Sequence, residues 1–242
     1  MSFLKNEKFQ KIFYPIFYFA FTIAITISGC YIFDRNYYTN IFVSGDSMVP
    51  TLVGSGTYRH YGIADTSSKA IDGLRRFDVL ITYYPKEWGS YNGLIVKRVW
   101  GFPGETISLH SDSNGSTFTV TSGGKVHEYT ATVVNKSVDM ITEKADMNLY
   151  KFVTDRKVFY TNAAGQRNMN DYTLGKNEYF VMGDNWASST DCYHNRGSSV
   201  KLTKNYLQGK VVCIQGYGKV EESTGGDYTI KEKHPIKARY II

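Results

Sequence analysis

The sequence predicts an all-β domain with several long connections, preceded by one transmembrane helix at the N-terminus. The helix is indicated by residues 12–33, which contain no Asp, Glu, Lys or Arg. The β domain is indicated by short β-branched and aromatic runs after residue 40 that end at Pro or Gly, with few helical periodicities among them. A chain of 242 residues is long enough for one or two domains with a buried core.

The uncharged segment 12–33 has the length of a membrane span. At a helical rise of about 1.5 Å per residue it covers roughly 33 Å, which matches the hydrocarbon thickness of a bilayer. A cleaved secretory signal is the alternative, but the run is longer than a typical signal core, and the bulky residues 30–33 offer no small-x-small site. Lys5, Lys8 and Lys11 precede the run, so residues 1–11 are expected in the cytoplasm and residues 36–242 outside it.

The charge and the cysteine and histidine patterns narrow the function classes. The net charge of +6 is spread along the chain without a dense basic stripe, so nucleic-acid binding is not expected, whereas contact with anionic membrane lipids is. Cys30 lies in the apolar segment, which leaves Cys192 and Cys213 as a possible disulfide pair, with two free thiols as the expectation. The five histidines show no metal-ligand spacing, so neither a metal nor another cofactor is expected.

The strands of the β domain can be followed from residue 41. A short apolar run at 41–43 is the first, and the run 78–84 is stopped by Pro85. Residues 94–100 form another, ended by the turn 101–104. Residues 117–120 and 126–133 flank the turn residues 122–124 and predict a hairpin.

Two of these strands deliver the residues that carry chemistry. Ser47 follows the strand 41–43 and precedes Pro50, so a fixed turn would expose its hydroxyl as a candidate nucleophile. Lys97 and Arg98 lie in the strand 94–100, where side chains alternate, so one of the two cations faces inward. A lysine in an apolar site has a lowered pKa, and its neutral amine can deprotonate a serine. The alternative is that both cations extend to solvent from an edge strand.

A third segment follows the apolar strand 179–182. Gly183-Asp184-Asn185 predicts a turn that fixes the loop behind it, which carries Ser188, Ser189, Thr190 and Asp191. The hydroxyls and carboxylates of that loop could orient Lys97 and pair Arg98. Taken alone, the segment is also compatible with an ordinary Asx turn.

In this order the three segments resemble the bacterial type I signal peptidases. Residues 44–52 (SGDSMVPTL) look like the nucleophile box of that family, 96–105 (VKRVWGFPGE) like its lysine box, and 180–185 (FVMGDN) with Ser189 and Asp191 like its last box. The resemblance implies that Ser47 is the nucleophile, Lys97 the general base, and Ser189 the hydroxyl that orients the amine. It also implies an ion pair of Asp191 with Arg98, with Asp184 close by. The Ser47 N–H would supply part of the oxyanion hole, while Gly45 stands where some members carry a second donor.

The family resemblance implies a signal-peptidase-like β fold and a membrane-bound serine endopeptidase. Such an enzyme sits in the cell membrane with a single span and an extracytoplasmic catalytic domain, and it removes signal peptides from secreted preproteins after a small-x-small site. Shallow apolar pockets that admit only small residues would be lined by Val43, Met48, Leu52, Ile95 and Val96. Residues 106–178 are expected to form a β-rich insertion or cap between the lysine box and the last box.

The last box departs from the usual family pattern. Trp186 replaces the Arg of the usual Gly-Asp-Asn-Arg, and Cys192 and Tyr193 replace the Ser and Arg of the usual Ser-x-Asp-Ser-Arg. A one-residue insertion would let Arg196 take the place of the lost arginine. These changes favour an alternative function, a weakly active or non-catalytic relative that assists assembly of surface structures such as pili.

Two other catalytic arrangements that use a serine are alternatives. The self-cleaving repressors share the Ser-Lys chemistry, but they lack a membrane span and carry an N-terminal DNA-binding helical domain, which this chain does not show. A Ser-His-Asp arrangement with His194 as the base is also conceivable. Lys97 makes that arrangement unnecessary.

Overall fold

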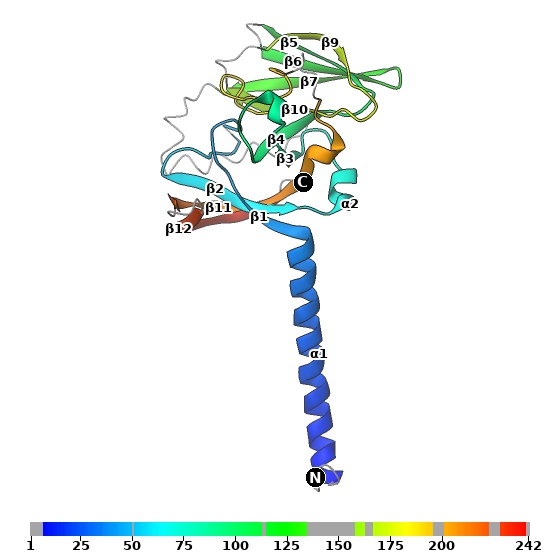
Figure 1. Ribbon diagram of the computed structural model, residues 1–242, viewed down its shortest axis with the longest axis vertical. Helices are drawn as coiled ribbons and strands as arrows, with labels where there is room; N and C mark the ends of the chain where they lie inside the picture. The colour runs from blue at the N-terminus through cyan, green and yellow to red at the C-terminus, as the bar shows by residue number, and fades with distance from the viewer. Residues whose placement is uncertain are drawn as a thin grey trace. The chain divides into compact units, whose positions relative to one another are not determined.

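The computed structural model describes residues 7–49, 51–112, 115–134, 158–162, 167–195, 201–222 and 228–240. The chain divides into two compact units, Met1–Tyr38 and Thr39–Ile242. The first unit contains a helix and the second contains the β-sheets (Figure 1).

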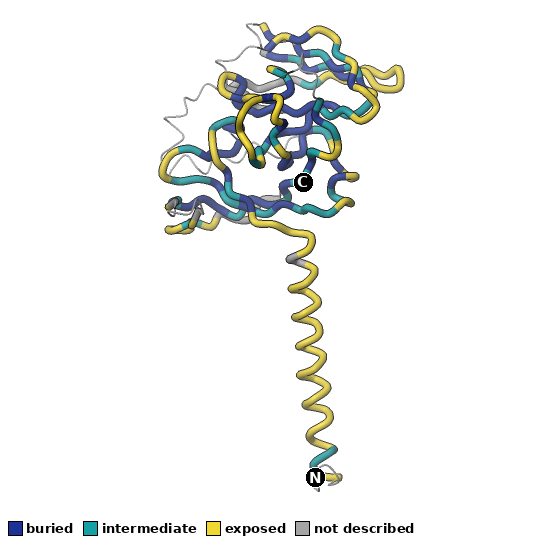
Figure 2. Tube along the Cα trace, viewed as in Figure 1, coloured by how far each residue is buried: buried dark blue, intermediate teal, exposed yellow. Residues whose placement is uncertain are grey.

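Helix α1 (Glu7–Tyr37) contains the predicted membrane segment. Glu7–Phe33 is the one helical stretch of the described chain that is long and apolar enough to cross a membrane. Figure 2 shows α1 exposed along nearly its whole length, and its exposed residues include large apolar ones such as Ile16 and Phe19. Thr22 and Thr26 donate their hydroxyls to the carbonyls of Tyr18 and Thr22, so each hydroxyl has a partner within the helix.

The larger sheet of the second unit has seven strands in the order β1-β2-β11-β3-β4-β10, with β12 also paired to β11. Its pairs described by register are antiparallel. The strand β11 is the organising element because it pairs with β2, β3 and β12. The bounds are β1 Tyr38–Phe42, β2 Tyr58–Asp65, β3 Val79–Tyr83, β4 Leu94–Gly101, β10 Phe180–Met182, β11 Leu207–Glu222 and β12 Tyr228–Tyr240.

The smaller sheet has five strands in the order β8-β7-β6-β5-β9, all drawn from the span 106–178. Its hairpin β6–β7 turns at Gly123 and Gly124, whose φ angles of 54° and 75° suit the positive-φ turn that joins twisted strands. The predicted hairpin is therefore present. The bounds are β5 Thr106–Asp112, β6 Gly115–Ser122, β7 Lys125–Val134, β8 Val158–Asn162 and β9 Met169–Thr173. The described part of this unit also contains three short helices: α2 Ser68–Asp72, η2 Lys86–Trp88 and η4 Lys204–Tyr206.

An aromatic core joins the two sheets. Trp100 of β4 meets Phe118 of β6 edge-on at 4.9 Å between ring centroids, and Phe77 meets Trp100 in the same way at 5.3 Å. Burial of such rings is among the largest apolar contributions that single side chains make to folding. Strands β3 and β10 pair with the two edges of β4, and its residues are buried on both faces from Lys97 onward.

The predicted class is confirmed: the chain is a mostly β-sheet domain with one long apolar N-terminal helix. The predicted strands 78–84 and 94–100 correspond to β3 and β4. The expectation that only one of Lys97 and Arg98 faces inward is wrong, since both are buried. Alternation still places them on opposite faces, but here each face is covered.

Candidate active site

Ser47 lies in a tight turn after β1. Gly45 takes a φ of 84°, and its N–H donates to the Gly54 carbonyl at 2.9 Å, closing the loop on itself. Met48 and Leu52 anchor the turn in the core, and the Leu52 N–H donates to the Met48 carbonyl. Ser47 itself remains partly exposed, so a rigid support presents a reachable hydroxyl. Pro50, expected to fix this turn, lies outside the described residues.

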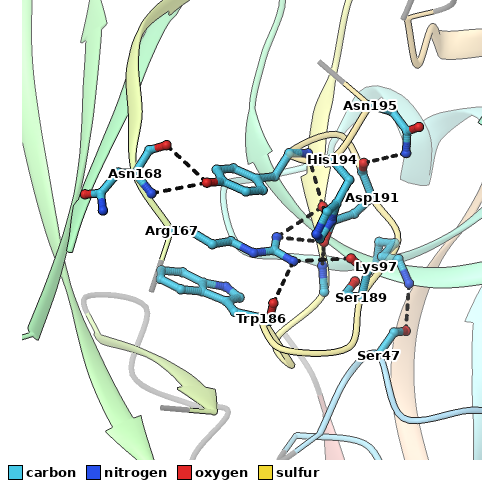
Figure 3. Close-up of polar contacts among 11 residues, drawn as sticks. Ser47, Lys97, Arg167, Asn168, Trp186, Ser189, Asp191, His194 and Asn195 are labelled. Carbon is cyan, nitrogen blue, oxygen red and sulfur yellow. Dashed lines mark hydrogen bonds and ion pairs between the residues drawn. The ribbon is translucent and has the colours of Figure 1, made fainter. Parts of the chain in front are cut away.

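Lys97 of β4 reaches this hydroxyl. Its Nζ donates to Ser47 Oγ at 2.6 Å, although the two residues are 50 positions apart (Figure 3). The lysine side chain is almost completely enclosed, with 3% of the residue exposed. Burial lowers its pKa from the ordinary 10.5 to about 8, against the opposing effect of two nearby carboxylates, Asp191 and Asp184. The arrangement is a serine next to an amine that readily loses its proton.

The loop after β10 closes the site from the other side. The Asn185 N–H donates to the Ser47 carbonyl at 3.0 Å, and its side-chain amide donates to the Asp46 carbonyl at 3.0 Å. Gly183 packs so closely that a Cβ there would lie 2.2 Å from both the Ser47 carbonyl oxygen and Ser189 Oγ. Only glycine fits this position, so the predicted Gly-Asp-Asn turn is in direct contact with the nucleophile turn.

Ser189 is brought to the site without the predicted hydrogen bond. Ser189 is buried beside Gly183. Within the described part of the chain its hydroxyl has no hydrogen-bond partner, so it makes no hydrogen bond to Lys97. An orienting contact between this hydroxyl and the amine remains a prediction.

Arg98 pairs with a different carboxylate from the one predicted. Its Nε donates to Asp184 Oδ1 at 2.8 Å, and its second amino group donates to Asp184 Oδ2, in a two-pronged arrangement. The guanidinium also donates to the Phe77 carbonyl at 2.8 Å and to Thr51 Oγ1 at 3.2 Å. The predicted pair of Arg98 with Asp191 is therefore wrong, because the turn at Gly183 places Asp184 on the arginine side of β4.

Asp191 pairs instead with Arg167, which no sequence motif indicated. Arg167 donates to both Asp191 oxygens, at 3.1 and 2.9 Å, and to the carbonyls of Trp186 and Ser189 (Figure 3). It lies just before β9, in the span 106–178 that carries no recognisable box. The one available signal was indirect: a buried aspartate requires a cation, and the box had lost its arginines. Arg196, the predicted substitute, lies outside the described residues.

The predicted pocket residues fall into two groups. Val43, Met48 and Leu52 are buried in one cluster, and Val96 packs against it. Ile95 instead packs against the core that joins the sheets. This division follows from strand alternation, because neighbouring residues of β4 point to opposite faces.

The partner of the Ser47 hydroxyl is Lys97, and neither His194 nor a cysteine takes that place. His194 Nδ1 lies 3.5 Å from Asp191 Oδ1, and the hydrogen bond to Ser47 comes from Lys97. Cys30, Cys192 and Cys213 are free thiols. Across the described ranges, no group of three His, Cys, Asp or Glu residues is placed to hold a metal ion.

Comparison with known protein families gives a match over most of the chain. A family model described as signal peptidase, peptidase S26, matches residues 13–214, which is most of the chain and includes Ser47, Lys97 and the loop after β10. A search of curated proteins found no match. The chain belongs to the peptidase S26 signal peptidase family.

Proposed function

We propose that this protein is a membrane-anchored serine endopeptidase that removes signal peptides from exported preproteins. The observation that carries the proposal is the 2.6 Å contact between Lys97 Nζ and Ser47 Oγ, made by an enclosed lysine and a reachable serine. Membership of the S26 family supports the substrate class, since signal peptides are what the family name refers to.

The proposed chemistry is acyl transfer in two steps. The neutral Lys97 amine takes the Ser47 proton while Oγ attacks the scissile carbonyl, and the resulting ammonium gives the proton to the leaving amine. Water then attacks the acyl-enzyme with Lys97 again acting as the base. The Ser47 backbone N–H is one donor to the oxyanion, whereas Gly45 has no side chain to supply a second donor.

The pKa of Lys97 sets the pH dependence of this reaction. With a pKa of about 8, about one molecule in ten has a neutral amine near pH 7. The rate is therefore expected to rise with pH and to level off above that pKa.

Cleavage of a preprotein by the full chain in detergent is the direct test. A preprotein with Ala at the first and third positions before the cut should be processed, whereas Ser47→Ala should leave it intact. Leu at the first position should slow cleavage by roughly 100-fold, because the extra bulk moves the scissile carbonyl away from Ser47. Rates are measured by gel mobility and the cut site by mass spectrometry. Equal cutting of Ala and Leu substrates would contradict the small-residue pockets proposed for Val43, Met48, Leu52, Ile95 and Val96.

The retained anchor and its orientation form a second prediction. Lys5, Lys8 and Lys11 flank the apolar helix on its N-terminal side, so the β domain should face outward. Protease added to intact protoplasts should digest the bulk of the chain, while a tag at the N-terminus should be protected. Protection of the β domain would reverse the orientation, and release of a mature form lacking α1 would show that the helix is a cleaved signal.

The alternative is an assembly factor without peptidase activity. Its support is the replacement of two arginines by Trp186 and Tyr193 in the last box. Since Arg167 supplies a cation to the same loop, that change does not leave Asp191 unpaired. Growth or surface-structure assembly that is restored fully by Ser47→Ala would favour the assembly factor over the peptidase.

A further inference from the structure

Arg167 is one of the most deeply buried charged residues that the structure describes. Only 1% of the residue is exposed, and its guanidinium makes four hydrogen bonds, two to the Asp191 carboxylate and one each to the Trp186 and Ser189 carbonyls. The guanidinium also lies near two aromatic rings, 4.7 Å from the centroid of Tyr193 and 5.8 Å from that of Trp186. One arginine thus connects four residues of the 183–193 loop.

The loop that Arg167 holds packs directly against the Ser47 turn. Asp191 Oδ2 accepts the Gly183 N–H at 3.0 Å, and Gly183 lies against the Ser47 carbonyl with no room for a Cβ. A chain of direct contacts therefore runs from Arg167 through Asp191 and Gly183 to Ser47.

The two aromatic residues next to Arg167 stand at altered positions of the last box. Trp186 and Tyr193 stand at the two positions where the usual pattern of the last box has arginine. Both rings lie near the guanidinium of Arg167, a residue just before β9. The Tyr193 hydroxyl further donates to the Asn168 carbonyl at 3.1 Å, which ties the residue following Arg167 to the loop. The loop therefore lacks the two arginines of the usual pattern, and Arg167 supplies a cation beside it.

We infer that Arg167 is a positioning residue for the Ser47–Lys97 pair, which holds the 183–193 loop through Asp191 and balances the charge of that carboxylate beside the lysine. The inference rests on the proposed function in so far as Lys97 is the base. Arg167 itself touches no reacting atom. It acts through Asp191 and the loop carbonyls.

The charge balance around the amine explains why a cation is needed there. The charged or titratable groups that act on Lys97 are two carboxylates, a guanidinium and a thiol: Asp191, Asp184, Arg167 and Cys192. Arg98 already pairs with Asp184, and burial raises the pKa of the Cys192 thiol, which keeps it neutral. Asp191 also faces His194, at 3.5 Å, but that imidazole is half exposed. Without Arg167, the Asp191 carboxylate would favour the protonated, inactive amine.

Arg76 provides a matched control. It too pairs with a carboxylate, that of Glu105 at 2.6 Å, donates to a backbone carbonyl, that of Trp100, and lies over two aromatic rings, Phe102 and Tyr129. No interaction places it beside Asp191, so Arg76→Met tests the general cost of losing an aromatic-flanked ion pair.

The experiment combines two pH titrations of the full chain in detergent. The ionisation of Lys97 is followed by NMR of ¹³Cε-labelled lysine, assigned with Lys97→Arg, and kcat/KM for an Ala-x-Ala preprotein is measured over the same range. Arg167→Met should raise the Lys97 pKa by about one, lower the rate near pH 7 about tenfold, and recover much of that loss at high pH. Arg167→Lys keeps the charge but not the four hydrogen bonds, so it should lower kcat without moving the pKa.

The remaining variants decide between positioning and simple structural support. Arg167→Met with Asp191→Asn removes both charges and should bring the Lys97 pKa back to its wild-type position or below it, because Asp191 acts on Lys97 more strongly than Arg167 does. Arg76→Met should leave that pKa and the pH profile unmoved even where it lowers the melting temperature. An unshifted Lys97 titration in Arg167→Met, or a uniform fall in rate at all pH values, overturns the inference. If Arg167→Met does not fold, an unchanged kcat in Arg167→Lys overturns it. A wild-type chain that cleaves nothing contradicts the proposed peptidase, while the NMR titration still tests the coupling of Arg167 to Lys97.

Discussion

Replacing Lys97 by arginine is expected to abolish cleavage although the positive charge is retained. A guanidinium does not lose its proton in the working pH range, so it cannot accept the proton of Ser47. The loss should be at least ~1000-fold in kcat, comparable to removal of a base that works as a unit with its nucleophile. Lys97→Met should be equally inactive, because the 2.6 Å contact to Ser47 Oγ is lost with the amine.

Lys97 should destabilise the fold at pH values below the pKa that the lysine has in the unfolded chain. Burial lowers its pKa from 10.5 to about 8, so between these values the unfolded chain binds more protons than the folded one, and stability rises with pH across that window. The difference corresponds to about 3 kcal/mol of destabilisation near pH 7, where the folded lysine is mostly charged. Lys97→Met removes this cost. It should therefore melt no lower than wild type at neutral pH, and its advantage should shrink from about pH 8 to pH 10.5.

Melting curves of both variants and wild type at several pH values, together with cleavage rates, check this prediction. Ser47→Ala serves as the inactive control that leaves the lysine in place. Retained cleavage by Lys97→Arg, or strong destabilisation of Lys97→Met at neutral pH, would identify Lys97 as a structural cation and support the assembly-factor function.

Replacing Arg98 by methionine is expected to cause a large loss of stability. The variant leaves the buried Asp184 carboxylate without its two-pronged partner, and it removes a donor from the Phe77 carbonyl. Breaking a buried ion pair on one side typically costs about 3–5 kcal/mol, which for a domain of this size lowers the melting temperature by roughly 10 °C. Cleavage measured well below the new melting temperature should also fall, since Asp184 adjoins Gly183 and Asn185, which contact the Ser47 turn.

The double variant Arg98→Met with Asp184→Leu provides the control. Removing both charges leaves no unpaired ion, so the double variant should be more stable than Arg98→Met alone. Chemical denaturation of the two variants and wild type measures the difference. A single variant that unfolds at the same denaturant concentration as wild type would show that water, rather than Arg98, satisfies Asp184.

Strand β11 could not be predicted from its local sequence pattern. Its 16 residues contain Gly209, Gly216 and Gly218, which weaken any strand pattern. A Cβ at Gly216 would lie 2.4 Å from the His234 carbonyl oxygen, and one at Gly218 would lie 2.3 Å from the Ile230 side chain. Gly216 and Gly218 are required by the close approach of β12, the next strand of the chain, so the reason for them appears only once β11 and β12 are paired.

The residues of the active site divide in the same way. The sequence by itself determined the long apolar helix, from its uncharged run, and the candidates Ser47 and Lys97, from short boxes whose local geometry is a turn and a strand. Only the tertiary structure decided that Lys97 and Arg98 are both buried, that Arg98 takes Asp184, and that Asp191 takes Arg167. Spacing along a chain fixes which side chains share a face of one strand. The choice of ion-pair partner depends on which carboxylate the folded loop brings within hydrogen-bond distance of a guanidinium, and that is set by contacts between segments far apart in sequence.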